Sequence, residues 1–151
     1  IHTKGVEDEM LDHQNHAKKN NLSLKDISNP KSMGPIKYSY TRHQLSSAYS
    51  GDIGDLQASL LSCMWSYQNL ASAMKKYYVK KNNPYKKWIE DYAKKKNLDS
   101  FKLACKLLDR KSLKYGKHAR ERMKNIFFIS VLHETALWDE YYNMVKWSDI
   151  I

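Results

Sequence analysis

The sequence predicts an all-α protein. Apolar residues recur at three- and four-residue steps in its two longest amphipathic stretches, which is the period of one buried helical face. No stretch shows the clear apolar and polar alternation of a half-buried strand, and no internal repeat of fixed period is present. With 151 residues and 42% hydrophobic composition, the chain can form one core but hardly two. We therefore expect a single helical domain over residues 1–151.

The first three helices are expected at residues 5–20, 38–49 and 52–80. The first is polar and fades into Asn-Asn-Leu-Ser, after which Pro30, Gly34 and Pro35 mark a connection. Ser50-Gly51-Asp52 closes the second helix and offers Asp52 as the N-cap of the third. The third ends before Pro84, because proline disfavours helical geometry in the residue before it.

The last three helices are expected at residues 84–92, 98–115 and 117–144. Pro84 suits the first turn of a short helix that carries Trp88 and Tyr92 on one face. Polar residues 94–97 separate this helix from the fifth, whose apolar stripe includes Cys105. Gly116 is a weak break before the sixth helix.

Two residues stand out on the inner faces of the third and sixth helices. Cys63 shares an apolar stripe with Leu56 and Tyr67 and is expected to point inward. Glu134 occupies a position at which its apolar neighbours predict burial. An unpaired buried carboxylate is costly, so this acid should have a partner, a raised pKa or a catalytic role.

A thiol and a carboxyl that converge from two helices would form a two-residue catalytic centre. A purely structural role stays open for each: Cys63 as a small buried hydrophobe, and Glu134 as an acid bonded to a tyrosine or an arginine. His133 lies about 100° round the helix from Glu134, so the two are not expected to face one site. Cys105 is expected to be structural.

Composition and charge argue against several classes of function. The formal net charge of +10 comes from 22 lysines and only four arginines against 16 acids. Recognition of phosphates and bases favours arginine, so we expect no nucleic-acid partner. No apolar run approaches the length that crosses a bilayer, and two cysteines make no disulfide framework. These features predict a soluble, cytoplasmic protein with no membrane partner.

The sequence has too few suitably placed ligands to predict a metal site. Glu9 and His13 are four residues apart in the first helix, and His16 follows one turn later, as in helical dimetal proteins. The third helix, however, offers no matching ligand on its inner face. The 11 tyrosines could instead line a pocket for a flat polar heterocycle, because each offers a stacking face and a hydroxyl donor.

Over residues 5–149, the chain carries an ordered set of motifs. They are Glu7-x-Glu9-Met10-x-x-His13, Tyr38-Ser39-Tyr40-Thr41-x-His43, Leu60-Leu61-Ser62-Cys63-Met64-Trp65-Ser66-Tyr67, Pro84-Tyr85-x-Lys87-Trp88-Ile89-x-x-Tyr92, Met123-Lys124-Asn125 with Phe127, Ser130-x-x-x-Glu134-x-x-x-Trp138, and Trp147-Ser148-Asp149. In this order the motifs resemble the TenA family, the cysteine-type thiaminase II or aminopyrimidine aminohydrolase group.

The resemblance implies a heme-oxygenase-like helical bundle, usually a homotetramer, that needs no metal and no organic cofactor. It implies hydrolysis of thiamin, or of a breakdown product that carries an aminomethyl-pyrimidine, to hydroxymethyl-pyrimidine for thiamin salvage. Cys63 matches the nucleophile of the family and Glu134 the acid beside the pyrimidine ring nitrogen. Tyr40, Tyr67 and Tyr92 match the pocket tyrosines.

The chain also departs from the family pattern. Ser62 stands where proline is common, and Leu137 takes a position on the pocket wall that is often aromatic. The family's additional N-terminal helices, with an acid that grips the aminopyrimidine, have no counterpart, so residues 1–151 are expected to be the C-terminal two-thirds of the family domain. Two other functions stay open: a catalytically weak pyrimidine-binding or regulatory bundle, and a heme-oxygenase-like metal oxidase built around Glu9 and His13.

Overall fold

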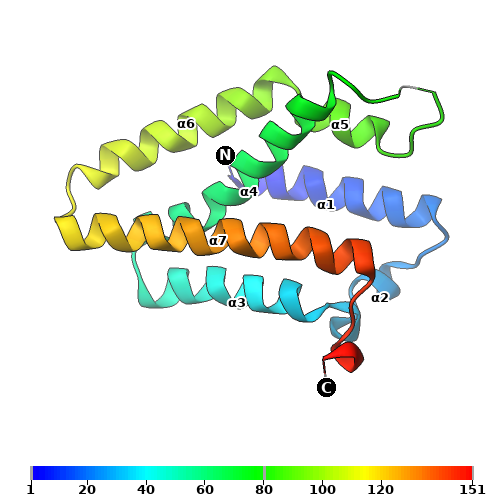
Figure 1. The fold of residues 1–151 in the computed structure, drawn as a ribbon, viewed down its shortest axis with the longest axis horizontal. Helices are drawn as coiled ribbons and strands as arrows, with labels where there is room; N and C mark the ends of the chain where they lie inside the picture. The colour runs from blue at the N-terminus through cyan, green and yellow to red at the C-terminus, as the bar shows by residue number, and fades with distance from the viewer. Residues whose placement is uncertain (1, 80, 151) are drawn as a thin grey trace. The chain divides into compact units, whose positions relative to one another are not determined.

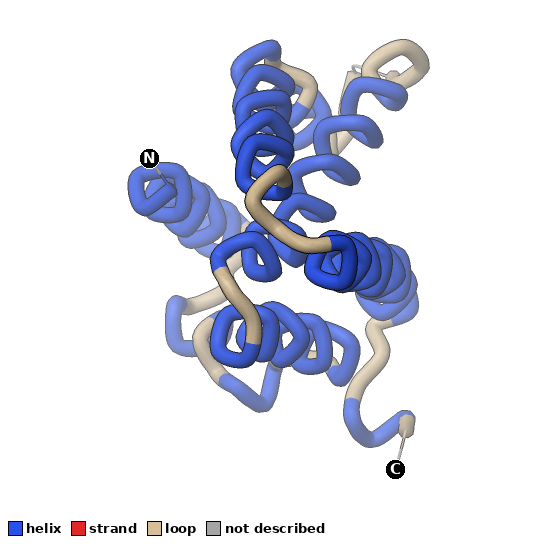
Figure 2. The backbone as a smooth tube through the Cα atoms, turned by 90° about the vertical axis from the view of Figure 1, so that its left-hand side faces the viewer, coloured by secondary structure: helices blue, strands red, loops and turns tan. Residues whose placement is uncertain are grey.

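The computed structural model describes residues 2–79 and 81–150. These residues form helices and connecting loops, with no strand among them, as Figure 2 shows. The all-α prediction is therefore confirmed for the part of the chain that is described. The chain divides into two compact units, one of Ile1–Pro35 with Val145–Ile151 and the other of Ile36–Met144. None of the described helices combines the length and apolarity needed to cross a membrane.

The first unit contains α1 (His2–Lys19), α2 (Leu24–Ile27) and two 3-10 helices, η1 (Pro30–Ser32) and η2 (Trp147–Asp149). Of these four helices, only α1 was predicted from the sequence. A capping box defines the start of α2, in which the Asp26 amide donates to Ser23 Oγ and the Ser23 amide donates to the Asp26 carboxylate. The Trp147 indole donates to the Met33 carbonyl at 3.0 Å, which ties η2 to the end of η1.

The second unit contains α3 (Pro35–Ser50), α4 (Ile53–Met74), α5 (Lys86–Tyr92), α6 (Lys95–Ser112) and α7 (Lys117–Asn143), although Pro35 itself is assigned to the first unit. All five helices were predicted. The N-cap role of Asp52 is confirmed, since its carboxylate accepts the amides of Gly54 and Asp55. Several expected boundaries were wrong by two or more residues: α3 begins at Pro35 instead of Tyr38, α5 begins at Lys86 instead of Pro84, and α6 ends at Ser112 instead of Tyr115. Helix α4 ends at Met74, where its apolar stripe ends and the basic residues after it meet the negative end of the helix dipole; the expected end, Lys80, lies outside the described residues. Helix α6 begins at Lys95, inside the expected polar break.

The buried face of α4 differs from the face that the apolar stripe predicted. Leu60 and Met74 continue the three- and four-residue steps of the predicted stripe but are 42% and 37% exposed. Small residues let neighbouring helices approach closely, and a Cβ added at Gly54 would lie only 2.8 Å from the Met123 sulfur of α7. The buried face of α4 consists largely of small residues, so it could not be predicted from the large apolar residues alone. The buried residues of α4 are Gly54, Asp55, Ala58, Ser59, Ser62, Gln68 and Ala71.

Helix α3 runs antiparallel to α7, beside which it lies in Figure 1. At the start of α3, the amides of Ile36 and Lys37 donate to the buried carboxylate of Glu140 at 2.6 and 3.1 Å. A negative charge at a helix N-terminus is favourable, and Pro35 has no N–H that would need a partner. This long-range cap fixes the first turn of α3 and thereby the position of Tyr40, one turn later.

An ion pair between a buried carboxylate and a half-exposed guanidinium connects the start of α4 to α7. Asp55 is fully buried, and its carboxylate accepts Arg122 Nη2 at 2.8 Å and Nε at 3.1 Å. Asp55→Asn should lower the free energy of unfolding by about 1–3 kcal/mol, because it removes the charge-assisted hydrogen bonds of a fully buried carboxylate. Urea denaturation measures this loss. The control Glu121→Gln alters an exposed pair with Lys124 and should change stability by less than about 0.5 kcal/mol; equal effects would contradict the assignment.

Candidate active site

A buried polar cluster joins α3, α4 and α7. The Tyr40 hydroxyl donates to Glu134 Oε1 at 2.8 Å and lies 2.8 Å from Ser62 Oγ. Tyr40, Ser62 and Glu134 are 4%, 0% and 3% exposed. The half-buried thiol of Cys63 is also hydrogen-bonded to the Glu134 carboxyl. The structure therefore brings Cys63 and Glu134 together, as the sequence predicted, and adds a phenol and a serine hydroxyl to the pair.

The protonation of the cluster follows from its burial. Burial raises the pKa of the Glu134 carboxyl above the ordinary 4.5, while the hydrogen bonds from Tyr40 and Cys63 and the charge of Lys37 act in the opposite direction and only partly offset it. Burial likewise raises the pKa of Tyr40, so this residue stays a neutral phenol. The other carboxyl oxygen, Glu134 Oε2, is buried and has no nitrogen or oxygen partner among the described residues. This oxygen is the natural place for a transferable proton.

Tyr67 and Trp138 lie one helical turn after Cys63 and Glu134, and their rings form a cluster with those of Trp88 and Tyr92 on α5. The Tyr67 ring centroid is 5.2 Å from that of Tyr92, 5.7 Å from that of Trp88 and 5.6 Å from that of Trp138. Leu137, also expected at the pocket, is buried on α7, one turn after Glu134. The predicted residues Tyr67 and Tyr92 are thus neighbours, with rings that present flat apolar faces and hydroxyls.

Two histidines support the outer side of the cluster. The His133 ring stacks on the Tyr40 ring at 5.3 Å with an interplanar angle of 14°, and its centroid lies 5.4 Å from that of His43. His133 and Glu134 were not expected to face one site, yet both contact Tyr40, His133 at its ring and Glu134 at its hydroxyl. His43 Nε2 lies 2.9 Å from Ser130 Oγ, so it too is held against α7.

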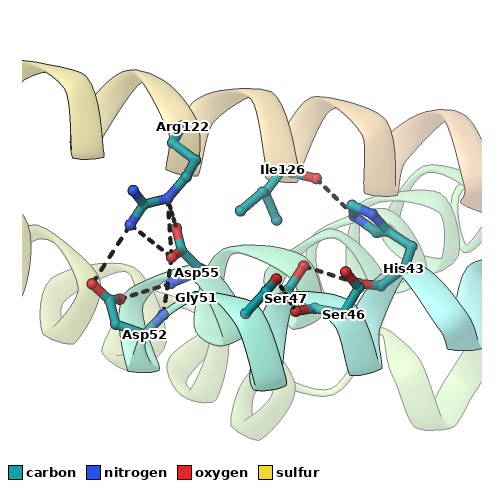
Figure 3. A pocket seen from close by; sticks show the side chains of 9 residues that line it. His43, Ser46, Ser47, Gly51, Asp52, Asp55, Arg122 and Ile126 are labelled. Atoms are coloured by element: carbon teal, nitrogen blue, oxygen red, sulfur yellow. Dashed lines mark hydrogen bonds and ion pairs between the residues drawn. The ribbon is translucent and has the colours of Figure 1, made fainter.

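A polar cavity of about 540 Å³ lies beside this cluster, at the junction of α3, α4 and α7 (Figure 3). Neither Cys63 nor Glu134 lines it. Its walls include His43 and the Asp55–Arg122 pair described above, together with serines whose hydroxyls bond to carbonyls of their own helix, such as Ser47 Oγ with the His43 carbonyl. The cavity is therefore separate from the Cys63–Glu134 pair.

Glu9 and His13 are exposed on α1. They belong to no group of three or more potential ligands that could hold a metal ion in the described part of the chain. This helix is part of the first unit, whereas every residue of the candidate active site belongs to the second.

Sequence reasoning missed Ser62 and Trp138 as members of the site. Ser62 was noted only as a departure from a family pattern, although Gly54, Ala58 and Ser62 recur every four residues. That spacing of small residues marks a helix face in close contact and was the available signal. Trp138 was named as the end of a motif; it is 41% exposed, and its ring belongs to the aromatic cluster.

Stability should depend on pH through Glu134. Its pKa is raised above 4.5, so the folded protein holds the proton more tightly than the unfolded chain does. The stabilisation is fully present below pH 4.5 and is lost as the pH rises through the raised pKa. Melting temperatures measured from about pH 4 to pH 9 should fall for the wild type relative to Glu134→Gln. Parallel curves for the two proteins would contradict the raised pKa.

The fold and this site define a class of protein: an all-α protein with a buried carboxyl, phenol and thiol cluster between three helices. The model of the TENA/THI-4/PQQC family matches residues 1–144, and the chain belongs to this family.

Known relatives agree with this assignment. The chain is 29% identical over 116 residues to an aminopyrimidine aminohydrolase of Bacillus subtilis, covering 76% of this chain and 48% of that protein. It is 28% identical over 138 residues to an aminopyrimidine aminohydrolase of Helicobacter pylori, covering 91% of this chain and 63% of the relative. The chain therefore spans between about half and two thirds of the length of these relatives.

A solved structure, that of a TenA homologue protein from P. horikoshii OT3, superposes with a TM-score of 0.76 at 25% sequence identity. The match covers 91% of this chain and 63% of the homologue. It confirms the heme-oxygenase-like helical fold that the sequence motifs implied.

Proposed function

We propose that this protein is an aminopyrimidine aminohydrolase of the thiaminase II type, which converts an aminomethyl-pyrimidine, or thiamin, to hydroxymethyl-pyrimidine. The observation that carries the proposal is the buried Glu134 carboxyl, which is bonded to the Tyr40 hydroxyl and to the Cys63 thiol. A protonated acid beside a nucleophile is the pair that addition to an electron-poor ring requires. The names of the relatives support this choice of substrate class.

The proposed reaction begins when the Cys63 thiolate forms a bond to a carbon of the pyrimidine ring. The electron pair displaced from the ring moves to a ring nitrogen, which takes the proton of Glu134. The amine takes the proton that the Cys63 thiol gave up, and it leaves as ammonia as the nitrogen returns the pair toward the exocyclic methylene. The oxygen of a water molecule bonds to the methylene and one water proton returns to the sulfur of Cys63. Glu134 recovers its proton from the ring nitrogen, and the carbon–sulfur bond breaks as the aromatic ring is restored. The balance is one amine and one water consumed, with one alcohol and one ammonia formed.

In this proposal the remaining residues hold the ring and the acid. Tyr67 and Tyr92 offer faces and hydroxyls to a flat heterocycle, and Leu137 supplies an apolar wall that holds the ring without aromatic stacking. Tyr40 orients the carboxyl of Glu134. The reaction also requires a reduced thiol, and Cys63 is in no disulfide, so we place the protein in the reducing cytoplasm.

The proposal predicts that an aminopyrimidine protects Cys63 from alkylation. Iodoacetamide labelling, quantified for each cysteine by peptide mass spectrometry, should slow at Cys63 by roughly tenfold or more when the pyrimidine occupies nearly all of the sites, because a bound ring covers the sulfur. Cys105, on the outer helix α6, serves as the internal control and should label at an unchanged rate.

The outcomes of this experiment distinguish two functions of the protein and a purely structural role of Cys63. Protection together with turnover supports the hydrolase. Protection without turnover would favour a pyrimidine-binding bundle. Equal labelling of Cys63 with and without the pyrimidine would reject both and leave Cys63 as a packing residue.

A further inference from the structure

The Tyr40 hydroxyl lies between two oxygen atoms but has only one proton. Ser62 Oγ and Glu134 Oε1 are each 2.8 Å from the phenol oxygen. A carboxyl oxygen that faces a neutral phenol accepts a hydrogen bond from it, so Tyr40 uses its one proton to donate to Glu134. The Tyr40 oxygen can then take part in the second hydrogen bond only as an acceptor, and Ser62 must be the donor.

Ser62 has one competing acceptor. Its hydroxyl also lies 3.2 Å from the Ser59 carbonyl of its own helix. The contact with Tyr40 is shorter by 0.4 Å (3.2 minus 2.8), and all of its atoms are shielded from water, where a hydrogen bond is strongest. The favoured arrangement is therefore a directed series in which Ser62 donates to Tyr40 and Tyr40 donates to Glu134 Oε1.

The helical geometry of α4 makes this arrangement specific to Ser62. Consecutive residues of a helix are about 100° apart, so Ser62 faces Tyr40 of α3 while Cys63 approaches Glu134 of α7. With Oε1 occupied as an acceptor, the carboxyl proton is left to Oε2, which has no nitrogen or oxygen partner among the described residues.

We propose that Ser62 is a positioning residue, which acts through Tyr40 to keep Glu134 Oε1 an acceptor and to place the transferable proton on Oε2. This inference rests on the proposed function, since it gives the proton of Glu134 a destination on the substrate. A proline at this position could not supply the hydroxyl. Ser62, the residue that precedes Cys63, thus adds to the site a hydroxyl that donates a hydrogen bond to Tyr40.

The first test observes the carboxyl directly and needs no turnover. The infrared C=O band of protonated Glu134, identified by its absence from Glu134→Gln, is followed as the pH is raised. Ser62→Ala should move this band to higher frequency, because Oε1 accepts a weaker hydrogen bond. It should also raise the pH at which the band disappears by about 0.5 or more, because the carboxylate loses support. Alanine favours the helix, so the variant is expected to fold.

Two comparisons distinguish positioning from a general effect of removing a buried hydroxyl. Ser59→Ala is the matched control: Ser59 is equally buried on α4, but its hydroxyl donates to the Leu56 carbonyl at 2.8 Å. It should leave the band unchanged. In a Tyr40→Phe background, Ser62→Ala should have no further effect, because the residue through which it acts is gone.

The same variants test the reaction. Ser62→Ala should lower kcat roughly three- to tenfold with little change in KM, which is the size of one neutral hydrogen bond. The proposal is overturned if Ser62→Ala leaves the band where Ser59→Ala leaves it, or if its effect persists undiminished in Tyr40→Phe. A wild type that catalyses no hydrolysis would reject the proposed function, while the infrared experiment would still decide the role of Ser62.

Discussion

Cys63→Ala is expected to lower kcat/KM for aminomethyl-pyrimidine hydrolysis on the order of a thousandfold or more, because no bond to the ring can form without the thiolate. The change removes a half-buried sulfur from the middle of α4, and alanine is well suited to a helix. The variant should therefore remain folded. Ammonia release measured at saturating and at low substrate gives kcat and kcat/KM separately, and circular dichroism checks the fold.

Cys105→Ala is the control for this experiment. Cys105 is half-buried on α6, and burial is the main cause that raises the pKa of its thiol, so at neutral pH it is mostly protonated and a weak nucleophile. Its replacement should leave kcat/KM within about twofold of the wild type. A comparable loss of activity at both cysteines would point to a loss of packing rather than of a nucleophile.

Glu134→Gln should lower kcat on the order of a hundred- to ten-thousandfold, the usual contribution of a general acid. Glutamine has nearly the same size, and its carbonyl can still accept the Tyr40 hydroxyl, so the site keeps its shape. The glutamine amide, however, has no acidic proton that it can donate to the ring nitrogen and later take back. Because shape and binding are preserved, the loss should appear in kcat more than in KM.

Two further measurements sharpen the test of Glu134. Pyrimidine protection of Cys63 in Glu134→Gln should persist, which would show that the ring still binds. The residual activity should no longer fall at high pH in the range where the wild type loses its proton. A Glu134→Gln variant with wild-type kcat would remove the general acid from the mechanism.

The helices were predictable because local signals fixed them. Asp52 marks a cap that the structure confirms, and the stripe of α7 placed Glu134 in a buried position. The short helices α2, η1 and η2 were missed because each has fewer than five residues, too few to show a 3.6-residue period. The start of α6 was missed because its first turn is polar and exposed, although it is helical.

The site was predictable only in part, for a related reason. The burial of Glu134 follows from one helix alone, whereas its hydrogen bond to Tyr40 joins residues 94 positions apart. Likewise, Glu140 caps α3 from a distance of more than 100 residues, and no local pattern could reveal it. Ser62 is a small polar residue on a face that an apolar count ignores, so its partner became evident only when α3 and α4 were seen together.

The most direct measurement is a time course of product formation from aminomethyl-aminopyrimidine with the purified 151-residue chain. Ammonia is quantified enzymatically, and hydroxymethyl-pyrimidine by chromatography, in the same samples. The account predicts that both products accumulate over many turnovers in a ratio of one to one. Folded protein that releases neither product, with Cys63 alkylated equally fast in the presence and absence of the pyrimidine, would contradict it.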